Sequence, residues 1–255
     1  MRLQKKKVIR DKLRKGKVSL GTWQQLPNAS VSEVLGSLGF DWVAVDMEHG
    51  AIDSKLLPDI CRAVELNNTL PLVRVLEATE SNCKQALDSG AGGIIAPMIK
   101  NADQLIKIKD FCCWPPSGSR GVGFSRANNF GEKFDEYLIE AQDPLLIAQI
   151  EHIEAVDNLE EILKVKGLDA IIIGPYDLSA SMGLTGNFRH DKFLESIDLI
   201  FSLSKKYNVS CGQHIVKPDL KLLQNNIQLG YQFIAYSIDA VLLYESAKKV
   251  ISFNK

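Results

Sequence analysis

Residues 40–50 read FDWVAVDMEHG, a short apolar run followed at once by acids and a histidine. The run itself, Trp42–Asp46, has the length of a buried strand. Reactive side chains that gather directly after such a strand are typical of the carboxyl end of a parallel sheet. The stretch therefore predicts one strand of an α/β fold with its polar groups at the strand end.

Seven further apolar runs resemble this one, and helical patterns lie between them. The runs are residues 18–22, 71–75, 92–96, 145–149, 170–173, 209–212 and 233–235. The helical patterns cover residues 31–38, 54–66, 81–88, 102–111, 155–163, 192–207, 220–228 and 241–250. Strands that alternate with helices form parallel sheets, so eight of each predict a closed (β/α)8 TIM barrel in a single α/β domain. A doubly wound open sheet is the alternative, because strand count alone does not prove closure.

The barrel is expected over residues 18–255, since a chain of 255 residues is close to the usual length of one TIM barrel. Residues 1–17 precede it and hold nine Lys or Arg against a single acid, Asp11. Val8, Ile9 and Leu13 can share one face of a helix there. We expect a short, basic, solvated helix across the barrel floor; an arm for membrane or nucleic acid is the alternative.

Charge and cysteine content indicate the class of partner and the compartment. The formal net charge of −1 argues against a general affinity for nucleic acid or anionic membrane. No run approaches the roughly 20 apolar residues that a bilayer crossing needs. The five cysteines are odd in number and show no paired CxxC spacing, which favours reduced thiols. The sequence therefore predicts a cytoplasmic protein without a general affinity for nucleic acid or membranes.

Two acids, Glu151 and Asp177, follow the fifth and sixth predicted strands. Neighbouring strand ends in a barrel bring such side chains to one rim. Mg²⁺ and Mn²⁺ prefer a few carboxylate oxygens, with water and substrate oxygens around them, so a divalent metal site is one interpretation. The other is a pair of solvated loop acids or helix caps, because Asp177 stands where an N-cap for a helix over 178–182 would be.

His49 and Arg74 also stand at predicted strand ends. Histidine titrates near neutral pH, so His49 beside two acids is a candidate for proton transfer, although a lone histidine is more often structural. Arg74 ends an otherwise apolar run and needs an anionic partner, because burying an unpaired charge is costly. That partner is either a substrate oxygen with developing negative charge or a neighbouring acid.

Two predicted loops carry further polar groups. Gly174 opens a Gly-Pro-Tyr-Asp turn that leads into a helix, whose first backbone N–H groups suit a carboxylate or phosphate; an ordinary Gly-Pro turn is the simpler interpretation. Residues 113–131 hold four glycines, Arg120 and Arg126. Because this loop comes after the fourth strand, we expect it on the catalytic face, where its arginines would favour an acidic or phosphorylated substrate.

Taken together, these segments resemble the class II pyruvate aldolases of the HpcH/HpaI family, typified by 2,4-dihydroxyhept-2-ene-1,7-dioate aldolase. The resemblance runs from about Gly16 to Asp239. It is carried by residues 39–42, 46–50, 73–75, 87–91, 95–98, 115–121, 149–151 and 174–178.

The resemblance implies reversible cleavage of a 4-hydroxy-2-oxo acid into pyruvate and an aldehyde. Glu151 and Asp177 would bind Mg²⁺ or Mn²⁺, with Co²⁺ or Zn²⁺ as substitutes, and the ion would stabilise an enolate as a Lewis acid. His49 would transfer protons, paired with Asp88 from a neighbouring subunit. Arg74 would steady the keto or enolate oxygen.

The resemblance also implies a substrate pocket and an assembly. The pocket residues would be Trp23 at the mouth, Gln149 at the metal site, Gly174, and Tyr176 and Asp177, whose backbone would take the pyruvate carboxylate. The assembly would be a homohexamer, a trimer of dimers that exchange their C-terminal helix. Two departures affect the aldehyde side: Tyr176 stands where the family usually has a small residue, and Tyr236-Ser237 stands where a glycine is common.

Two other functions remain open at this point. An oxaloacetate decarboxylase, or another lyase acting through the enolate of pyruvate or phosphoenolpyruvate, would use the same groups. A non-catalytic barrel used for binding or assembly, docking through its basic start, is the alternative from a different class of protein.

Overall fold

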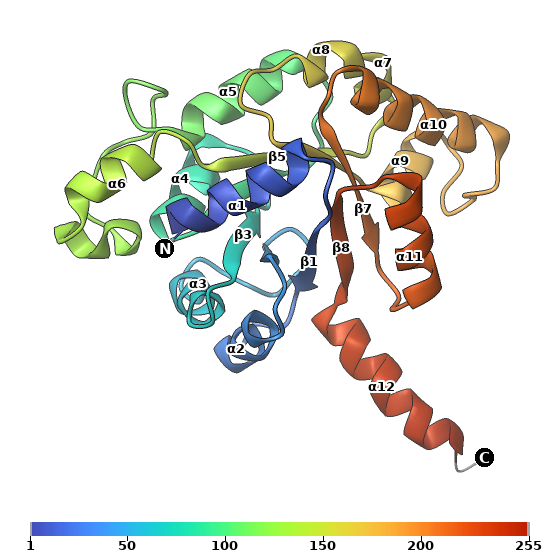
Figure 1. Ribbon diagram of the computed structural model, residues 1–255, viewed down its shortest axis with the longest axis horizontal. Coiled ribbons are helices and arrows are strands. Elements are labelled where there is room, and N and C mark those ends of the chain that lie inside the picture. The colour runs from blue at the N-terminus through green and yellow to red at the C-terminus, as the bar shows by residue number, and fades with distance from the viewer. Residues whose placement is uncertain (1, 254–255) are drawn as a thin grey trace.

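The computed structural model describes residues 2–253 and contains a closed barrel of eight parallel strands, which confirms the predicted fold class (Figure 1). The strands are β1 (Ser19–Gln24), β2 (Trp42–Asp46), β3 (Leu70–Arg74), β4 (Gly93–Ala96), β5 (Leu145–Ile150), β6 (Ala170–Ile173), β7 (Ser210–Ile215) and β8 (Phe233–Ile238). Strand β1 pairs with both β2 and β8, so the sheet closes on itself. This closure excludes the doubly wound open sheet.

Helices join the strands and cover the outside of the barrel (Figure 1). They are α1 (Arg2–Arg14), α2 (Ala29–Ser37), α3 (Leu57–Glu65), α4 (Glu80–Asp88), α5 (Ala102–Cys112), η1 (Arg126–Gly131), α6 (Phe134–Glu140), α7 (Ile153–Asp157), α8 (Leu159–Leu163), α9 (Pro175–Ser181), α10 (Asp191–Lys206), α11 (Leu220–Leu229) and α12 (Asp239–Phe253). Strands buried on both faces need this cover, which is why their sequences are apolar without alternation.

Several predicted boundaries are wrong. The helix predicted over 155–163 is two short helices, α7 and α8, which divide at Asn158. The Asn158 side-chain amide donates to the carbonyls of Glu154 and Lys100, and this alternative bonding favours a break in the helix. Strands β7 and β8 each end three residues later than predicted, and α6 and η1 are additional to the predicted helices.

Large side chains fill the lower part of the barrel. Trp42 at the start of β2 stacks on Phe233 at the start of β8, with 4.3 Å between the ring centroids. Gly21 makes room for the Trp42 ring, because a Cβ on this residue would lie 2.1 Å from it. The barrel interior is therefore a packed core rather than a channel.

Helix α1 crosses the barrel floor, the end at which the strands begin (Figure 1). Ile9 and Leu13 are buried there in the same apolar cluster as Leu70 and Leu145. The floor position is thus as predicted, but Val8 does not share the buried face and is 38% exposed. Because its apolar face is packed into the core, α1 is part of the fold and not a loose basic arm.

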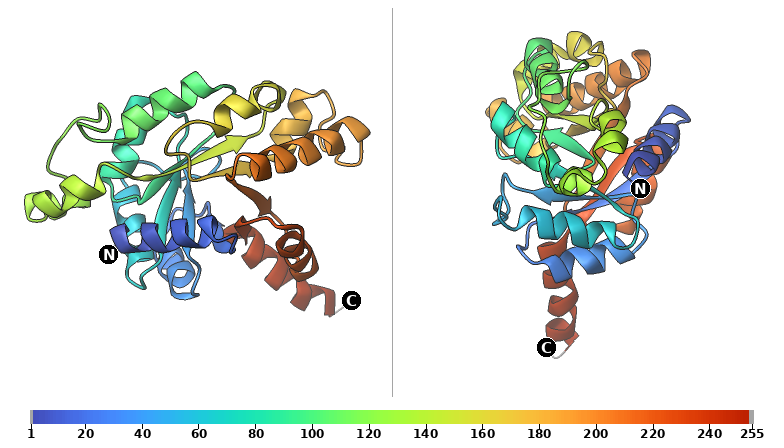
Figure 2. Two further views of the ribbon diagram at one scale, coloured as in Figure 1. Left: turned by 45° about the horizontal axis from the view of Figure 1, so that its top comes forward. Right: turned by 90° about the vertical axis from the view of Figure 1, so that its left-hand side faces the viewer.

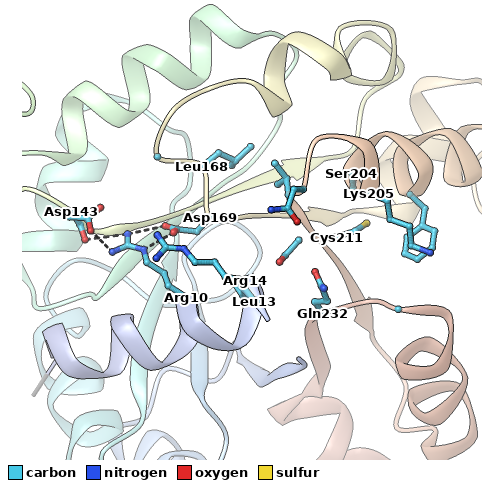
Figure 3. A pocket seen from close by; sticks show the side chains of 16 residues that line it. Arg10, Leu13, Arg14, Asp143, Leu168, Asp169, Ser204, Lys205, Cys211 and Gln232 are labelled. Carbon is cyan, nitrogen blue, oxygen red and sulfur yellow. Dashed lines mark hydrogen bonds and ion pairs between the residues drawn. The ribbon is translucent and has the colours of Figure 1, made fainter. Parts of the chain in front are cut away.

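Ion pairs hold α1 against the barrel floor, beside a pocket of about 420 Å³ (Figure 3). Figure 3 shows Arg10 directed at Asp143 and Asp169. Its Nε donates to Asp169 Oδ1 at 2.6 Å, and it also pairs with Asp143. Asp169 in turn accepts from the backbone N–H of Leu146 at 3.0 Å. Arg10 therefore joins the N-terminal helix to the starts of β5 and β6.

Replacing Arg10 by alanine should lower the free energy of unfolding by about 2–4 kcal/mol, because the Asp169 side chain, only 11% exposed, would lose its cation. Urea unfolding measures this loss. The control is Arg62→Ala: the Arg62–Asp59 pair lies in solvent, and its removal should change stability by less than about 0.5 kcal/mol. Equal losses in the two variants would show that the Arg10 contacts do not stabilise the floor.

Residues 113–131 lie at the floor, and the prediction that they belong to the catalytic face is wrong. Helix α5 follows β4 and returns the chain to the floor before this segment begins. Arg126 donates to the carbonyl of Ser89 at 3.0 Å and pairs with Glu65, while Arg120 is buried beside Tyr137. Both arginines hold the floor together and do not contact the substrate pocket of their own subunit.

Helix α12 projects away from the barrel in every view (Figures 1 and 2). At its start the Asp239 carboxylate accepts from the backbone N–H groups of Gln25 and Leu26, both at 2.9 Å. Its exposed apolar side chains are Leu243, Tyr244, Val250, Ile251 and Phe253. An apolar helix surface of this kind is typical of a contact between proteins. Between residues 2 and 253, no helix combines the length and apolar content that crossing a membrane requires.

Candidate active site

A cavity of about 350 Å³ opens at the carboxyl ends of the strands. It is lined by seven of the predicted site residues: Trp23, His49, Arg74, Gln149, Gly174, Tyr176 and Asp177. The other lining residues are Gln25, Ile172, Ile173, Pro175, His214, Val216 and Ile238. Since TIM barrels build their active sites at this end, the cavity is the candidate active site.

Four side chains from alternate strands form its inner end: Trp23 on β1, Arg74 on β3, Gln149 on β5 and His214 on β7. Through β2, Trp23 is in register with Leu72, and Arg74 lies two residues further along β3. The same step of two residues leads from Arg74 to Gln149, from Gln149 to His214, and from His214 back to Trp23. They form one layer of the barrel interior, here called the top layer.

Trp23 connects two members of the top layer. The Arg74 guanidinium carbon lies 5.1 Å from the centroid of the Trp23 ring, and the His214 ring stacks on Trp23 at 4.7 Å. Trp23 is only 1% exposed. It therefore forms the base of the cavity rather than its mouth, and it fixes the planes of the two groups beside it.

Asp46 and Arg74 form a buried bidentate pair. Arg74 Nε and Nη2 donate to the two Asp46 carboxylate oxygens at 2.9 and 2.7 Å. Burial would raise the pKa of Asp46, but the bonds from Arg74 outweigh burial and lower it. The pKa of Arg74 is raised, because Asp46 outweighs the lowering by burial. Of the two partners considered for Arg74, the neighbouring acid is present.

Glu48 and His49 follow Asp46 at the cavity rim. Arg74 Nη1 lies 2.9 Å from Glu48 Oε2, an ion pair that lacks the alignment of a hydrogen bond. Burial and the nearby Asp46 carboxylate raise the pKa of Glu48 despite Arg74. The His49 side chain is 60% exposed, with Nε2 4.0 Å from Glu48 Oε2. An exposed imidazole in a cavity wall can exchange protons with a ligand.

Glu151 lies behind Gln149 and is 1% exposed. One carboxylate oxygen accepts from the Met98 backbone N–H at 2.7 Å, and the other accepts from Gln149 Nε2 at 2.5 Å. Burial raises the pKa of Glu151 to about 7, and the carboxylates of Glu48 and Asp177 add to this effect. Glu151 is thus a buried acid in a region of negative potential.

Gly174 lets the backbone pass directly over Glu151. A Cβ on Gly174 would lie 2.5 Å from Glu151 Oε2, so no larger residue fits. Helix α9 begins at the next residue with Gly174 as its N-cap, and Asp177 lies in its first turn. Asp177 is therefore not an N-cap, contrary to one of its two interpretations. Tyr176 is exposed and packs edge-on against Phe188.

The donor groups around Glu151 suit a hard divalent cation. Gln149 Oε1 is buried without a hydrogen-bond partner, close to the Glu151 carboxylate. Hard cations favour such oxygen donors. The carboxylates of Glu151 and Asp177 also carry negative charge that a bound cation would compensate. Glu151 and Asp177 would hold such an ion. Across the described residues 2–253, no three His, Cys, Asp or Glu side chains cluster as ligands of one ion.

Asp88 lies apart from this cavity. It is the last residue of α4, where the helix has returned to the floor, and its carboxylate is 3.9 Å from Arg120 Nη1. Burial raises its pKa, although Arg120 and Lys84 act against this. His49 follows β2 at the opposite end of the barrel. Asp88 and His49 of one subunit therefore cannot form a pair.

His214 and Gln25 line the cavity but are not among the predicted site residues. The seventh strand is predicted to end at Gly212, whereas β7 continues to Ile215 and brings His214 into the top layer. Gln25 directly follows β1 and donates to Asp46 Oδ2 at 2.9 Å. His214 could have been found from the alternation of side chains along a strand, because it stands two residues after the inward-facing Gly212.

A closed parallel barrel with acids, an arginine and histidines at the carboxyl ends of its strands defines an enzyme of the TIM-barrel class. The profile of the HpcH/HpaI aldolase/citrate lyase family matches residues 19–246. The chain belongs to this family, which confirms the resemblance found in the sequence.

Individual relatives agree with this membership. The chain is 33% identical over 250 residues to the 2-keto-3-deoxy-L-rhamnonate aldolase of Shigella boydii serotype 4 (strain Sb227), which covers 97% of this chain and 92% of the relative. An HpcH/HpaI family protein from Burkholderia cenocepacia J2315 superposes with a TM-score of 0.90 at 30% identity, over 96% and 98% of the two chains. The citrate synthase SbnG superposes with a TM-score of 0.82 at 25% identity, over 96% of each chain. The family match and the aldolase relative support lyase activity.

Proposed function

We propose that the protein is a divalent-metal-dependent aldolase that reversibly cleaves a 4-hydroxy-2-oxo acid into pyruvate and an aldehyde. The observation that carries the proposal is the arrangement of Arg74 and Gln149 in one layer, with the buried acid Glu151 behind Gln149. The Arg74 guanidinium and the oxygen donors around Glu151 lie at one cavity, and together they suit a substrate that carries a carboxylate and a keto group. The aldolase name of the Shigella relative supports the same reaction.

Arg74 suits the charge that this reaction develops. Cleavage removes the proton of the C4 hydroxyl, breaks the C3–C4 bond and leaves its electron pair on the pyruvate part as an enolate. Asp46 holds the Arg74 guanidinium rigidly beneath the cavity. A preorganised donor stabilises such an oxyanion without reorganising during the reaction. Arg74 would therefore steady the keto oxygen as it becomes negative.

Glu151 and Asp177 would hold Mg²⁺ or Mn²⁺, with Co²⁺ or Zn²⁺ as substitutes. When bound, such an ion supplies Lewis-acid stabilisation of negative charge on the substrate. Gln149 would keep the Glu151 carboxylate oriented through its 2.5 Å hydrogen bond. The backbone N–H groups of Tyr176 and Asp177 would bind the substrate carboxylate at the start of α9.

His49 would take the C4 hydroxyl proton and later return a proton to C3, with the partner subunit's Asp88 orienting its ring. This requires an assembly, and we propose a cytoplasmic homohexamer, a trimer of dimers that exchange α12. The exposed apolar side chains of α12 would be covered in that exchange. Residues 18–255 would form the catalytic barrel, and residues 1–17 its basic helical segment.

Pyruvate release from a panel of 4-hydroxy-2-oxo acids, coupled to lactate dehydrogenase and NADH, tests the proposal. Purified protein with Mn²⁺ or Mg²⁺ should release pyruvate, EDTA should abolish release, and added metal should restore it. Glu151→Ala should reduce kcat/KM by about 100-fold or more. The control is Glu154→Ala: its side chain is 55% exposed, and activity should not change. Absence of pyruvate, or equal activity in both variants, would overturn the proposal.

The same preparation separates the other two candidate functions. Faster loss of oxaloacetate than of any 4-hydroxy-2-oxo acid would favour a decarboxylase. Absence of turnover together with absence of Mn²⁺ binding by calorimetry would favour a non-catalytic barrel.

A further inference from the structure

His214 is the ionisable member of the top layer that the proposed reaction does not use. Its ring lines the cavity and is held on two sides. One face stacks on Trp23 with 24° between the ring planes, and Nε2 lies 3.2 Å from the carbonyl oxygen of Ser237. A histidine fixed in this way presents its other nitrogen, Nδ1, in one orientation.

The Ser237 carbonyl determines which nitrogen carries the proton. A carbonyl oxygen only accepts, so Nε2 must be the donor in this contact. Burial lowers the pKa of His214 to about 4, so near pH 7 the ring is neutral and has a single N–H. With that hydrogen on Nε2, Nδ1 offers a lone pair and is a hydrogen-bond acceptor.

Ser237 is itself held in position for this contact. Its φ of 60° lies in the left-handed region, which residues other than glycine rarely adopt. Its hydroxyl donates to the Val216 carbonyl at 3.0 Å and ties the end of β8 to the segment after β7. Strained backbone persists where its surroundings fix it, and here it fixes the acceptor that selects the His214 tautomer.

We propose that His214 makes the enzyme selective for hydroxylated substrates, with Nδ1 accepting a hydrogen bond from a hydroxyl on the aldehyde-derived part of the 4-hydroxy-2-oxo acid. This inference rests on the proposed aldolase reaction. The pyruvate part carries no O–H or N–H when its carboxyl group is ionised, so it cannot supply the donor. The C4 hydroxyl loses its proton during cleavage and belongs with His49. The hydroxyl that remains for His214 lies further along the aldehyde part.

The same geometry disfavours two other kinds of aldehyde. An alkyl group would leave Nδ1 without a donor in a partly dehydrated cavity, which costs binding free energy. A carboxylate or phosphate would bring anionic oxygens against a lone pair. The ring cannot adapt by moving its proton to Nδ1, because Nε2 and the Ser237 oxygen would then both be acceptors. A neutral hydroxylated aldehyde meets neither obstacle.

Two substrates of equal size test the inference: 4,5-dihydroxy-2-oxopentanoate and 4-hydroxy-2-oxohexanoate, which differ by a hydroxyl in place of a methyl group. The enzyme should favour the dihydroxy acid by about 10- to 100-fold in kcat/KM. In His214→Leu this ratio should fall towards one. In His214→Asn, whose side-chain oxygen can replace Nδ1 as acceptor, part of the preference should return.

Each outcome of the assay decides a different statement. Absence of pyruvate from both acids would overturn the proposed function, and this inference with it. Pyruvate from both acids without preference, or an equal loss on both acids in His214→Leu, would overturn the inference alone. Thermal unfolding of each variant checks that the barrel is intact, and it separates loss of selectivity from loss of fold.

A readout independent of turnover is the ¹⁵N NMR spectrum of the histidine rings. At pH 7 the His214 signals should show a protonated Nε2 and an unprotonated Nδ1, and this pattern should persist below pH 5. The signals are assigned by their absence in His214→Leu. A protonated Nδ1 at pH 7 would overturn the inference, because Nδ1 would then be a donor and could not accept a hydrogen bond from a hydroxyl.

Discussion

Arg74→Ala is expected to lower kcat/KM for aldol cleavage by about 100- to 1000-fold and the free energy of unfolding by about 3–5 kcal/mol. Both effects have one origin. Arg74 neutralises Asp46, which is fully buried, and the same guanidinium faces the cavity. Without it, Asp46 remains as an uncompensated charge and the substrate oxygen loses its donor. Urea unfolding and the pyruvate assay measure the two losses separately.

Arg74→Lys is the matched control, since it keeps the charge and loses the planar fork that bonds both oxygens of Asp46. Stability should recover in part, while activity should remain low. Because Arg74 lowers the pKa of Asp46, the pair stabilises the fold above the usual carboxylate pKa and ceases to do so as pH falls through the lowered value. The stability difference between the wild type and Arg74→Ala should therefore shrink in acid. A constant difference would show that the ion pair is not its cause.

Mixing two inactive variants should restore activity. Asp88→Asn alone and Glu151→Ala alone should each have less than about 1% of wild-type activity, while hexamers assembled from both in equal amounts should recover up to about a quarter. The reason is that a site with an intact Glu151 can receive an intact Asp88 from the other variant. Coexpression with two affinity tags, followed by the pyruvate assay, measures the recovery.

The control for this experiment combines Arg74→Ala with Glu151→Ala. Both residues belong to the site of a single subunit, so every site in the mixture lacks one of them and activity should not return. An active Asp88→Asn variant, or mixed hexamers without activity, would contradict a role for Asp88 in the neighbouring site. Asp88 would then have only a structural role at the floor of its own barrel.

The strands could be predicted where their sequences are apolar up to the last residue. The bounds of β2 and β6 agree residue for residue with the prediction, because both are buried on both faces. The prediction of β7 is wrong from Gln213 onward, because Gln213 and His214 are polar but still part of the strand. When strands are predicted from apolar runs, a polar residue marks the end of a strand. A functional site, however, places polar residues inside a strand.

The segment 113–131 failed for a different reason. If only the strands are counted, the segment follows β4 and would belong to the catalytic face. Helix α5 lies between them, and it reverses the direction of the chain. The sequence pattern already predicts this helix, so the correct end of the barrel could have been found by counting helices as well as strands. The arginines of the loop would then have been assigned to the floor.

The stretch 40–50 and its seven counterparts determined by themselves the alternation of strands and helices, the barrel class and the strand-end positions of His49, Arg74 and Glu151. These follow from local periodicity, which is a property of the chain alone. Only the tertiary structure decided that Arg74 pairs with Asp46, that Asp88 lies at the far end of its own barrel, and that His214 joins the top layer. Layer membership depends on the register of neighbouring strands around a closed barrel, and no segment contains that information by itself.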